Sequence, residues 1–208
     1  HLADDNDLMI IEDASHAIGT DYITSSDKKI SIGSCRYSTM TTFSFHPVKT
    51  IAAGEGGAIT TNNKELAEKL FRFRNHGITR DKDLFFNKQL SVDEEGVINP
   101  WYYEIQELGY NYRLSDIHSA LASSQLSKLS SFKEKRSFLV NKYDEFFKEA
   151  SSLIQPIKRI NNCNPAWHLY VVHIDFESLG ITRSSVINRL AEEGIGSQVH
   201  YIPLHWQP

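Results

Sequence analysis

The stretch LMIIEDASHAIG, residues 8–19, decides the fold. Its apolar run, Leu8 to Ile11, is short and uninterrupted, which is typical of a strand buried on both faces of a parallel sheet. Asp13 follows just past this run, and open α/β sheets bind their ligands at the carboxyl ends of their strands. We therefore expect an α/β domain with Asp13 at its binding edge, although an aspartate at this position can also simply cap the following turn.

Hydrophobic periodicity and turn residues predict the other elements. In chain order they are strands at 40–45 and 57–61, a helix capped by Asn62 or Asn63 and ending near Phe73, an irregular aromatic-rich segment at 76–104, a helical pattern from Ser115 to about Ala150, a strand at 167–175, a helix at 183–193 and a strand at 196–202.

The helical pattern that starts at Ser115 is unusually long. At 1.5 Å per residue, about 35 residues span roughly 50 Å, which is more than one compact domain needs. The helix either bends near LSKLSS (126–131) or bridges two domains, and we favour the bridge.

Composition excludes several classes of protein. The chain has 208 residues, 40% of them hydrophobic, with 22 basic against 26 acidic side chains and a net charge of −4. This is a globular composition without the basic excess of nucleic-acid binders. The chain has neither an apolar run long enough for a membrane helix nor the features of a signal peptide, so we expect a cytoplasmic protein. Cys35 and Cys163 are interpreted as reduced thiols.

The two ends of the chain look unfinished. It begins without methionine, runs almost at once into a strand typical of the middle of an α/β domain, and closes on VHYIPLHWQP (199–208). We therefore expect an internal piece of a longer protein.

The nine histidines do not suggest a metal site. His168 and His173 are five residues apart on an expected strand, which directs them to opposite faces. The sequence contains neither an HExxH motif nor a CxxC pair. We expect no metal.

The loop SFHPVKTIAAGEGGAIT (44–60) holds a lysine, Lys49, that precedes three glycines. A phosphate-binding P-loop places its lysine after the glycines and opens a helix, and the dinucleotide fingerprint spaces its glycines differently, so both are disfavoured. Lys49 is either an ordinary surface lysine or, in apolar surroundings that lower its pKa, a residue able to form a Schiff base.

Four co-linear segments carry a resemblance to a known family. They are EDASHAIGTDY (12–22), FSFHPVKTIAAGEGGAITTN (43–62), FRNHGITR (73–80) and GYNYRLSDIHSALASSQL (109–126). The chain resembles the DegT/DnrJ/EryC1/StrS nucleotide-sugar aminotransferases, which are fold-type I enzymes dependent on pyridoxal 5′-phosphate. DASHA and EGGAITTN are most similar to the transaminases of pseudaminic acid biosynthesis, which aminate C4 of a UDP-linked 4-keto-6-deoxy-N-acetylhexosamine.

The resemblance implies a fold and a domain organisation. The fold is the aspartate-aminotransferase-like α/β fold, a three-layer, mostly parallel sheet, incomplete here and followed by a smaller α+β domain. Residues 1–114 would be the later part of the large cofactor-binding domain, 115–150 a long bridging helix, and 151–208 an incomplete small C-terminal domain.

The resemblance also implies roles for residues around the cofactor. Lys49 would hold pyridoxal phosphate and move a proton during the reaction, and Asp13 would keep the pyridine nitrogen protonated. His16 matches a position on the side of the cofactor's phenolic oxygen. Ser44 would bond the phosphate through its hydroxyl.

More distant residues are implied to complete the site. Asn111 matches an asparagine that reaches the phosphate from the neighbouring subunit, which implies a homodimer with shared active sites. Arg113 would lie at that phosphate or in the interface. His200, Tyr201 and His205 would meet the sugar nucleotide, or serve only as structure.

The implied reaction is a ping-pong transamination from L-glutamate to a 4-keto-6-deoxy nucleotide sugar, for cell-surface or flagellar glycans. One alternative is a pyridoxal-phosphate-dependent sugar dehydratase of the same fold, in which a histidine replaces the lysine; the presence of Lys49 counts against it. A second alternative is a catalytically inactive, truncated scaffold.

Overall fold

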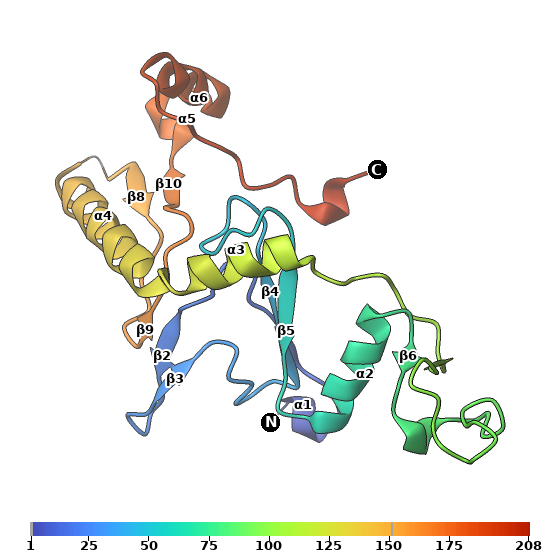
Figure 1. Ribbon diagram of the computed structural model, residues 1–208. Helices are drawn as coiled ribbons and strands as arrows, with labels where there is room; N and C mark the ends of the chain where they lie inside the picture. Colours follow the sequence, from blue (N-terminus) through green and yellow to red (C-terminus); the bar gives the residue numbers. More distant parts are fainter. Residues whose placement is uncertain (1, 151) are drawn as a thin grey trace. The chain divides into compact units, whose positions relative to one another are not determined.

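The computed structural model describes residues 2–150 and 152–208 (Figure 1). The helices are α1 (Leu2–Asp5), α2 (Lys64–Arg74), α3 (Asp116–Leu126), α4 (Leu129–Glu149), α5 (Phe176–Leu179) and α6 (Arg183–Glu192), with short 3-10 helices η1 (Lys82–Leu84) and η2 (Leu204–Trp206). The strands are β1 (Ile11–Asp13), β2 (Asp21–Ile23), β3 (Lys29–Ser31), β4 (Met40–Ser44), β5 (Gly57–Thr60), β6 (Ile78–Thr79), β7 (Glu104–Ile105), β8 (Ile154–Pro156), β9 (Cys163–Asn164) and β10 (Val172–Ile174).

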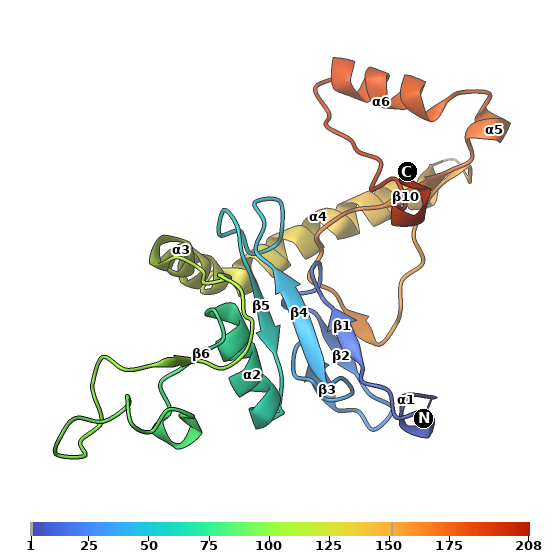
Figure 2. The ribbon, with the colours of Figure 1, turned by 90° about the vertical axis from the view of Figure 1, so that its right-hand side faces the viewer.

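A three-stranded sheet of order β1-β4-β5 forms the framework of the candidate site (Figure 2). β1 and β4 are parallel, with Asp13 opposite Thr42, whereas β4 and β5 are antiparallel, with Ser44 opposite Gly57. Because β1 and β4 run in the same direction, their last residues, Asp13 and Ser44, emerge at the same edge of the sheet. This is the α/β arrangement that the sequence predicts.

The prediction for the first strand is wrong in its position and in its burial. The strand covers Ile11–Asp13 rather than Leu8 to Ile11. The side chains of residues 8–11 are 42–75% exposed. Complete burial of such a run requires elements that cover both faces of the sheet, and β1 lies at the margin of its sheet, with β4 as its hydrogen-bonded neighbour.

The most fully buried of the described residues lie in the loop that joins β4 to β5 and in β4 itself. Ile51 and Ala53 in this loop are 1% and 0% exposed, and Thr41 of β4 is 0% exposed. The loop backbone is therefore anchored in the interior.

Both predicted helix N-caps are confirmed. The Asn63 side chain accepts a hydrogen bond from the N–H of Leu66 at the start of α2, and the Ser115 side chain accepts one from the N–H of His118 at the start of α3. The segment at 76–104 is largely irregular, as expected, with short elements at β6, η1 and β7.

The pattern from Ser115 to Ala150 is not one continuous helix. It breaks at Ser127 and Lys128, inside LSKLSS, into α3 and α4. The described chain divides into two compact units. One ends at Phe138 within α4 and takes in Ile160–His168, and the other consists of Leu139–Arg159 and Leu169–Pro208. The three-part division at 114/115 and 150/151 stays a prediction.

The second unit contains fewer strand residues than predicted. Helix α6 matches the prediction, but the strand expected at 167–175 is reduced to β10, which pairs antiparallel with β8 over three residues. No strand forms at 196–202, because no neighbouring backbone in the described part of the chain pairs with that segment. His168 lies outside β10, so the opposite-face argument for His168 and His173 does not apply.

Two features are absent from the described residues. No helix there has the length and apolar character needed to cross a bilayer. No group of three or more histidine, cysteine, aspartate or glutamate side chains in that part of the chain is arranged to hold a metal ion.

Candidate active site

Asp13, Ser44 and Lys49 are positioned by adjoining parts of the β1-β4-β5 sheet. Asp13 ends β1, Ser44 ends β4, and Lys49 lies in the loop from β4 to β5. The Ala14 N–H donates to the carbonyl of Thr42 at 2.9 Å, which extends the β1/β4 pairing past Asp13. The backbone that carries the Asp13 carboxylate is therefore fixed to β4.

Hydrogen bonds from Ser15 hold the Asp13 carboxylate. Asp13 Oδ1 accepts a hydrogen bond from the Ser15 N–H at 3.0 Å and one from the Ser15 hydroxyl at 2.5 Å. These bonds, with smaller contributions from the positive charges of His16 and Lys49, lower the pKa of Asp13 below its ordinary value. Asp13 is thus an anion that both caps its turn and interacts electrostatically with Lys49.

Backbone hydrogen bonds close the lysine loop on itself. The Phe45 N–H donates to the Gly56 carbonyl at 2.8 Å, the Ala53 N–H donates to the Phe45 carbonyl at 2.9 Å, and the Lys49 N–H donates to the His46 carbonyl at 2.9 Å. Lys49 is half-buried rather than sealed in an apolar pocket, but the next residue, Thr50, is buried.

Two hydroxyl groups lie along the same loop. Ser44 Oγ accepts a hydrogen bond from the His46 N–H at 3.4 Å, which leaves its own proton available to donate. Thr50 Oγ1 is buried and has no hydrogen-bond partner among the described residues. A buried hydroxyl without a partner is unusual in proteins. This one belongs to Thr50, the residue that follows Lys49.

His16 lies in the turn that follows Asp13. Its ring centroid is 4.4 Å from that of His168, with the two rings inclined at 66°. The role of His16 beside the cofactor's phenolic oxygen stays a prediction.

Asn111 and Arg113 lie on an exposed segment that pairs with the residues after α2. Asn111 forms an isolated antiparallel bridge with Asn75. Arg113 Nη1 donates to Asn75 Oδ1 at 2.8 Å. The structure therefore gives Arg113 a partner in its own chain, and the roles of both residues at a neighbouring subunit's phosphate stay predictions.

The N-terminal end of α3 packs close to the glycines of the lysine loop. A Cβ atom on Gly56 would lie 2.6 Å from Leu114 Cδ1, and one on Gly54 would lie 3.3 Å from the His118 ring. His118 is not among the predicted site residues, and its position in the fourth family-like segment is the sequence signal that could have identified it.

The predicted substrate residues belong to the second unit. His200, Tyr201 and His205 are exposed, and the rings of His200 and Tyr201 stack with their centroids 3.8 Å apart. Their contact with a sugar nucleotide stays a prediction.

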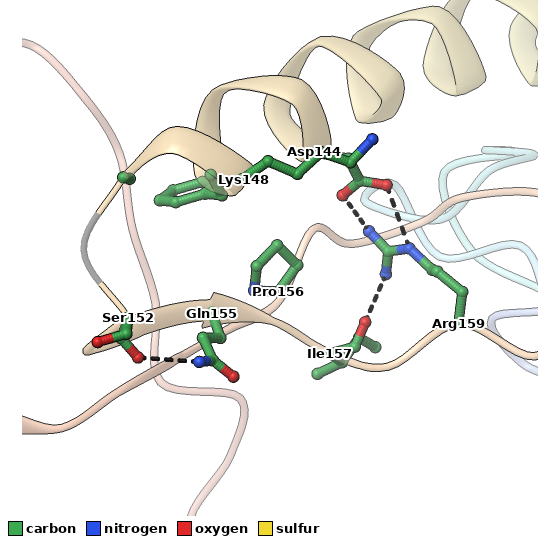
Figure 3. A pocket seen from close by; sticks show the side chains of 9 residues that line it. Asp144, Lys148, Ser152, Gln155, Pro156, Ile157 and Arg159 are labelled. Carbon is green, nitrogen blue, oxygen red and sulfur yellow. Dashed lines mark hydrogen bonds and ion pairs between the residues drawn. The ribbon is translucent and has the colours of Figure 1, made fainter.

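The second unit also carries a hollow of about 490 Å³ between the end of α4 and the β8 segment (Figure 3). Arg159 on its wall binds Asp144 at 2.7 Å and the Ile157 carbonyl at 3.3 Å. Burial favours the neutral form of Asp144, but hydrogen bonds from Arg159 and Tyr170 outweigh it and hold the pKa of Asp144 below its usual range. The charges on this wall thus stabilise the unit's own packing, and none of the predicted site residues lines the hollow.

The sequence profile of the DegT/DnrJ/EryC1/StrS aminotransferase family matches residues 1–208. The chain belongs to this family. The resemblance identified in the sequence is confirmed, and the family is one of transferases that depend on pyridoxal phosphate.

Curated relatives match the whole chain. The chain is 40% identical to the uncharacterized protein MJ1066 of Methanocaldococcus jannaschii over 100% of this chain and 49% of the relative. It is 37% identical to the UDP-4-amino-4,6-dideoxy-N-acetyl-beta-L-altrosamine transaminase of Campylobacter jejuni over 99% of this chain and 48% of the relative. The chain therefore spans about half the length of the curated relatives it matches.

Solved structures of aminotransferases share the fold. Helicobacter pylori PseC, an aminotransferase of pseudoaminic acid biosynthesis, matches with a TM-score of 0.81 and 29% identity over 99% of this chain and 48% of that chain. The putative sugar aminotransferase Spr1654 of Streptococcus pneumoniae, in its PLP form, matches with a TM-score of 0.73 and 28% identity over 95% of this chain and 45% of that chain. The fold-type I aminotransferase architecture, here in part, is confirmed.

Pyridoxal 5′-phosphate is the cofactor of this family, and Spr1654 has been solved in both PLP and PMP forms. The donor set at the β1/β4 edge fits this group. Asp13 supplies an anionic carboxylate for a pyridinium nitrogen, Lys49 supplies a primary amine for the aldehyde carbon, and Ser44 supplies a hydroxyl donor for a phosphate oxygen.

Proposed function

We propose that the protein carrying this chain is a transaminase that moves an amino group onto a keto group of a nucleotide sugar. The observation that carries the proposal is the convergence of Asp13, Ser44 and Lys49 at one edge of the β1-β4-β5 sheet, in a chain of the aminotransferase family. Asp13 caps its turn through Ser15, and the positive charge of Lys49 also favours its anionic form.

The residues at this edge would divide the work between them. Pyridoxal phosphate, when bound, supplies the electron sink for the reacting carbon. The anionic Asp13 would hold a proton on the ring nitrogen, because an opposite charge favours the protonated form of a base. Lys49 would anchor the cofactor and then carry a proton to and from the substrate carbon. Ser44 would donate its hydroxyl proton to a phosphate oxygen.

We further propose that the active protein is a homodimer with shared sites. Asn111 would reach the phosphate bound by the neighbouring subunit. Two features support the proposal: Asn111 is exposed, and its backbone is bridged to that of Asn75, so that its side chain is presented on a supported segment. Arg113, bonded to Asn75, would stiffen the same segment.

The acceptor we propose is a UDP-linked 4-keto-6-deoxy-N-acetylhexosamine, the donor is L-glutamate, and the order is ping-pong. The named activity of the Campylobacter jejuni relative and the pathway of Helicobacter pylori PseC support the acceptor. His200, Tyr201 and His205 would contact the sugar nucleotide.

A stepwise screen tests the proposal. The full-length protein carrying this chain is loaded with pyridoxal phosphate, treated with L-glutamate alone and separated from it, and then given the keto sugar nucleotide alone. We expect 2-oxoglutarate in the first step and an amino sugar, aminated at C4, in the second. A protein that binds the cofactor but releases no 2-oxo acid from L-glutamate or from any other amino acid would contradict transamination and favour an inactive scaffold.

A further inference from the structure

Ser15 holds the carboxylate of Asp13 in an asymmetric way. Both of its hydrogen bonds, from the N–H and from the hydroxyl, end on Oδ1. Oδ2 of Asp13 accepts no hydrogen bond from the residues that the structure describes. One oxygen is therefore fixed by the protein, and the other is left for a partner from outside.

A second aspartate in the chain shows the contrasting arrangement. At the start of α5, Ser178 also donates its N–H and its hydroxyl to an aspartate three residues before it, Asp175. There the N–H donates to Oδ1 at 3.0 Å and the hydroxyl to Oδ2 at 2.8 Å. Both oxygens of Asp175 are used in capping, which is what a purely structural aspartate requires.

We propose that Ser15 is a positioning residue of the active site, which fixes Oδ1 of Asp13 so that Oδ2 is presented to the ring nitrogen of the cofactor. The inference rests on the proposed function, since it gives Ser15 a task only where Asp13 pairs with that nitrogen.

The surroundings restrict where the carboxylate can turn. Ala14 is buried, and its N–H is bonded to β4, so the backbone at Asp13 is fixed. Glu12, the preceding residue, is held separately by the hydroxyls of Ser38 and Thr41, at 2.7 and 2.8 Å. Because neighbouring residues of a strand point to opposite faces, Glu12 does not compete for the partner of Asp13.

Ser15, His16 and Lys49 are the groups that act on the Asp13 charge. The two hydrogen bonds of Ser15 have the largest effect on the pKa of Asp13, ahead of the charges of His16 and Lys49. Hydrogen bonds to a charged group are stronger than those between neutral groups, so removal of the hydroxyl should weaken the anionic form of Asp13. The backbone N–H would remain.

Three variants of the full-length protein test the inference. Ser15→Ala removes the hydroxyl, Ser15→Thr keeps it, and Ser178→Ala removes the matching hydroxyl at Asp175. If Ser15→Ala does not fold, Ser15→Cys, which retains the size and weakens the donor, takes its place. The first readout is the pKa of the Asp13 carboxyl in the cofactor-free protein, measured by carbon-13 NMR. The others are the affinity for pyridoxal phosphate, the pH dependence of the bound cofactor's absorbance, and kcat and KM.

We expect Ser15→Ala to raise the pKa of Asp13, to weaken cofactor binding and lower kcat by about tenfold each, and to leave the KM for the sugar nucleotide nearly unchanged. Ser15→Thr should restore the wild-type values, and Ser178→Ala should change none of them. Equal effects of Ser15→Ala and Ser178→Ala on all these readouts would overturn the inference. The proposed function fails separately, if the wild-type protein does not bind pyridoxal phosphate.

Discussion

Lys133 Nζ lies 3.0 Å from Asp21 Oδ2 and 2.7 Å from the carbonyl oxygen of Gly19. Through these two contacts, helix α4 is bonded to the end of the turn that follows Asp13 and to the first residue of β2. Ser31 and Lys29 also bind the Asp21 carboxylate, at 2.7 and 3.1 Å. This cluster of Lys133, Asp21, Lys29 and Ser31 holds the end of the turn that follows Asp13 in place.

Replacement of Lys133 should destabilise the protein. The Lys133 and Asp21 side chains are 17% and 13% exposed, so the variant Lys133→Ala leaves a largely buried carboxylate with only Ser31 and the exposed Lys29. We expect a loss of about 1–3 kcal/mol in the free energy of unfolding, measured by urea denaturation. Lys135→Ala, an exposed neighbour on the same helix, is the control. Equal stability of the two variants would show that the contacts of Lys133 with Asp21 and Gly19 do not stabilise the fold.

The same cluster predicts a pH dependence of stability. Burial alone would raise the pKa of Asp21, but hydrogen bonds from Ser31, Lys133 and Lys29 outweigh it and lower the pKa to about 2, from an ordinary value of 3.8. Because the folded state prefers the anion, the contribution of Asp21 is present above pH 3.8 and is lost as the pH falls toward 2. The stability difference between wild type and Asp21→Asn should therefore shrink over this range. A difference that grows on acidification would contradict it.

Gly77 should tolerate no side chain. It has a φ of +74°, and an added Cβ atom would collide with the carbonyl oxygen of Glu107. Gly96, at a φ of +80°, has no atom within 4 Å of an added Cβ, so it shares the backbone strain without the collision. We expect Gly77→Ala to cost about 1–3 kcal/mol more than Gly96→Ala in thermal or urea unfolding. Indistinguishable stabilities would mean that the approach of Glu107 is not tight.

A mixture of two inactive proteins tests the shared site. If Asn111 serves the neighbouring subunit, a dimer of Lys49→Ala with Asn111→Ala contains one intact site. After exchange of subunits, the equimolar mixture should reach about a quarter of the wild-type activity, because random pairing makes half of the dimers mixed and each has one working site. A mixture that exchanges subunits but stays inactive would rule out sharing through Asn111.

Features determined by local chemistry could be predicted from the sequence. Asn63 and Ser115 cap their helices as expected, because a side-chain oxygen before an apolar repeat has a defined backbone partner. Asp13 lies at a strand end, and Lys49 lies in the loop after the neighbouring parallel strand. Both positions could be predicted because they follow from the order of strand-like segments and loops along the sequence.

Features determined by distant partners could not be predicted. The apolar run at Leu8 resembles a buried strand, but its burial depends on neighbouring elements rather than on its own residues. The segment at 196–202 has strand-like residues, yet a strand requires a paired backbone that the sequence pattern does not reveal. The break at Ser127 lies in LSKLSS, where a bend was one of the two expected alternatives, but the apolar repeat alone could not choose between that bend and a continuous bridging helix.

The contacts of Ser15 with Asp13 could be predicted only in part. A serine two residues after an aspartate is a recognised turn pattern, so its backbone bond to Asp13 could have been predicted. The arrival of both bonds on one oxygen could not, because it depends on rotamers set by the surrounding turn.

Above all, we propose that Lys49 carries the cofactor at the β1/β4 edge. The most direct measurement is the visible absorbance of the full-length protein with saturating pyridoxal phosphate, before and after borohydride, for the wild type, Lys49→Ala and Lys49→Arg. We predict a yellow wild-type protein whose band is bleached by borohydride, with the cofactor then attached covalently to the peptide containing Lys49, and no such band in either variant. A colourless wild-type protein, or a Lys49→Ala variant that keeps the band and the covalent attachment, would show that Lys49 does not carry the cofactor.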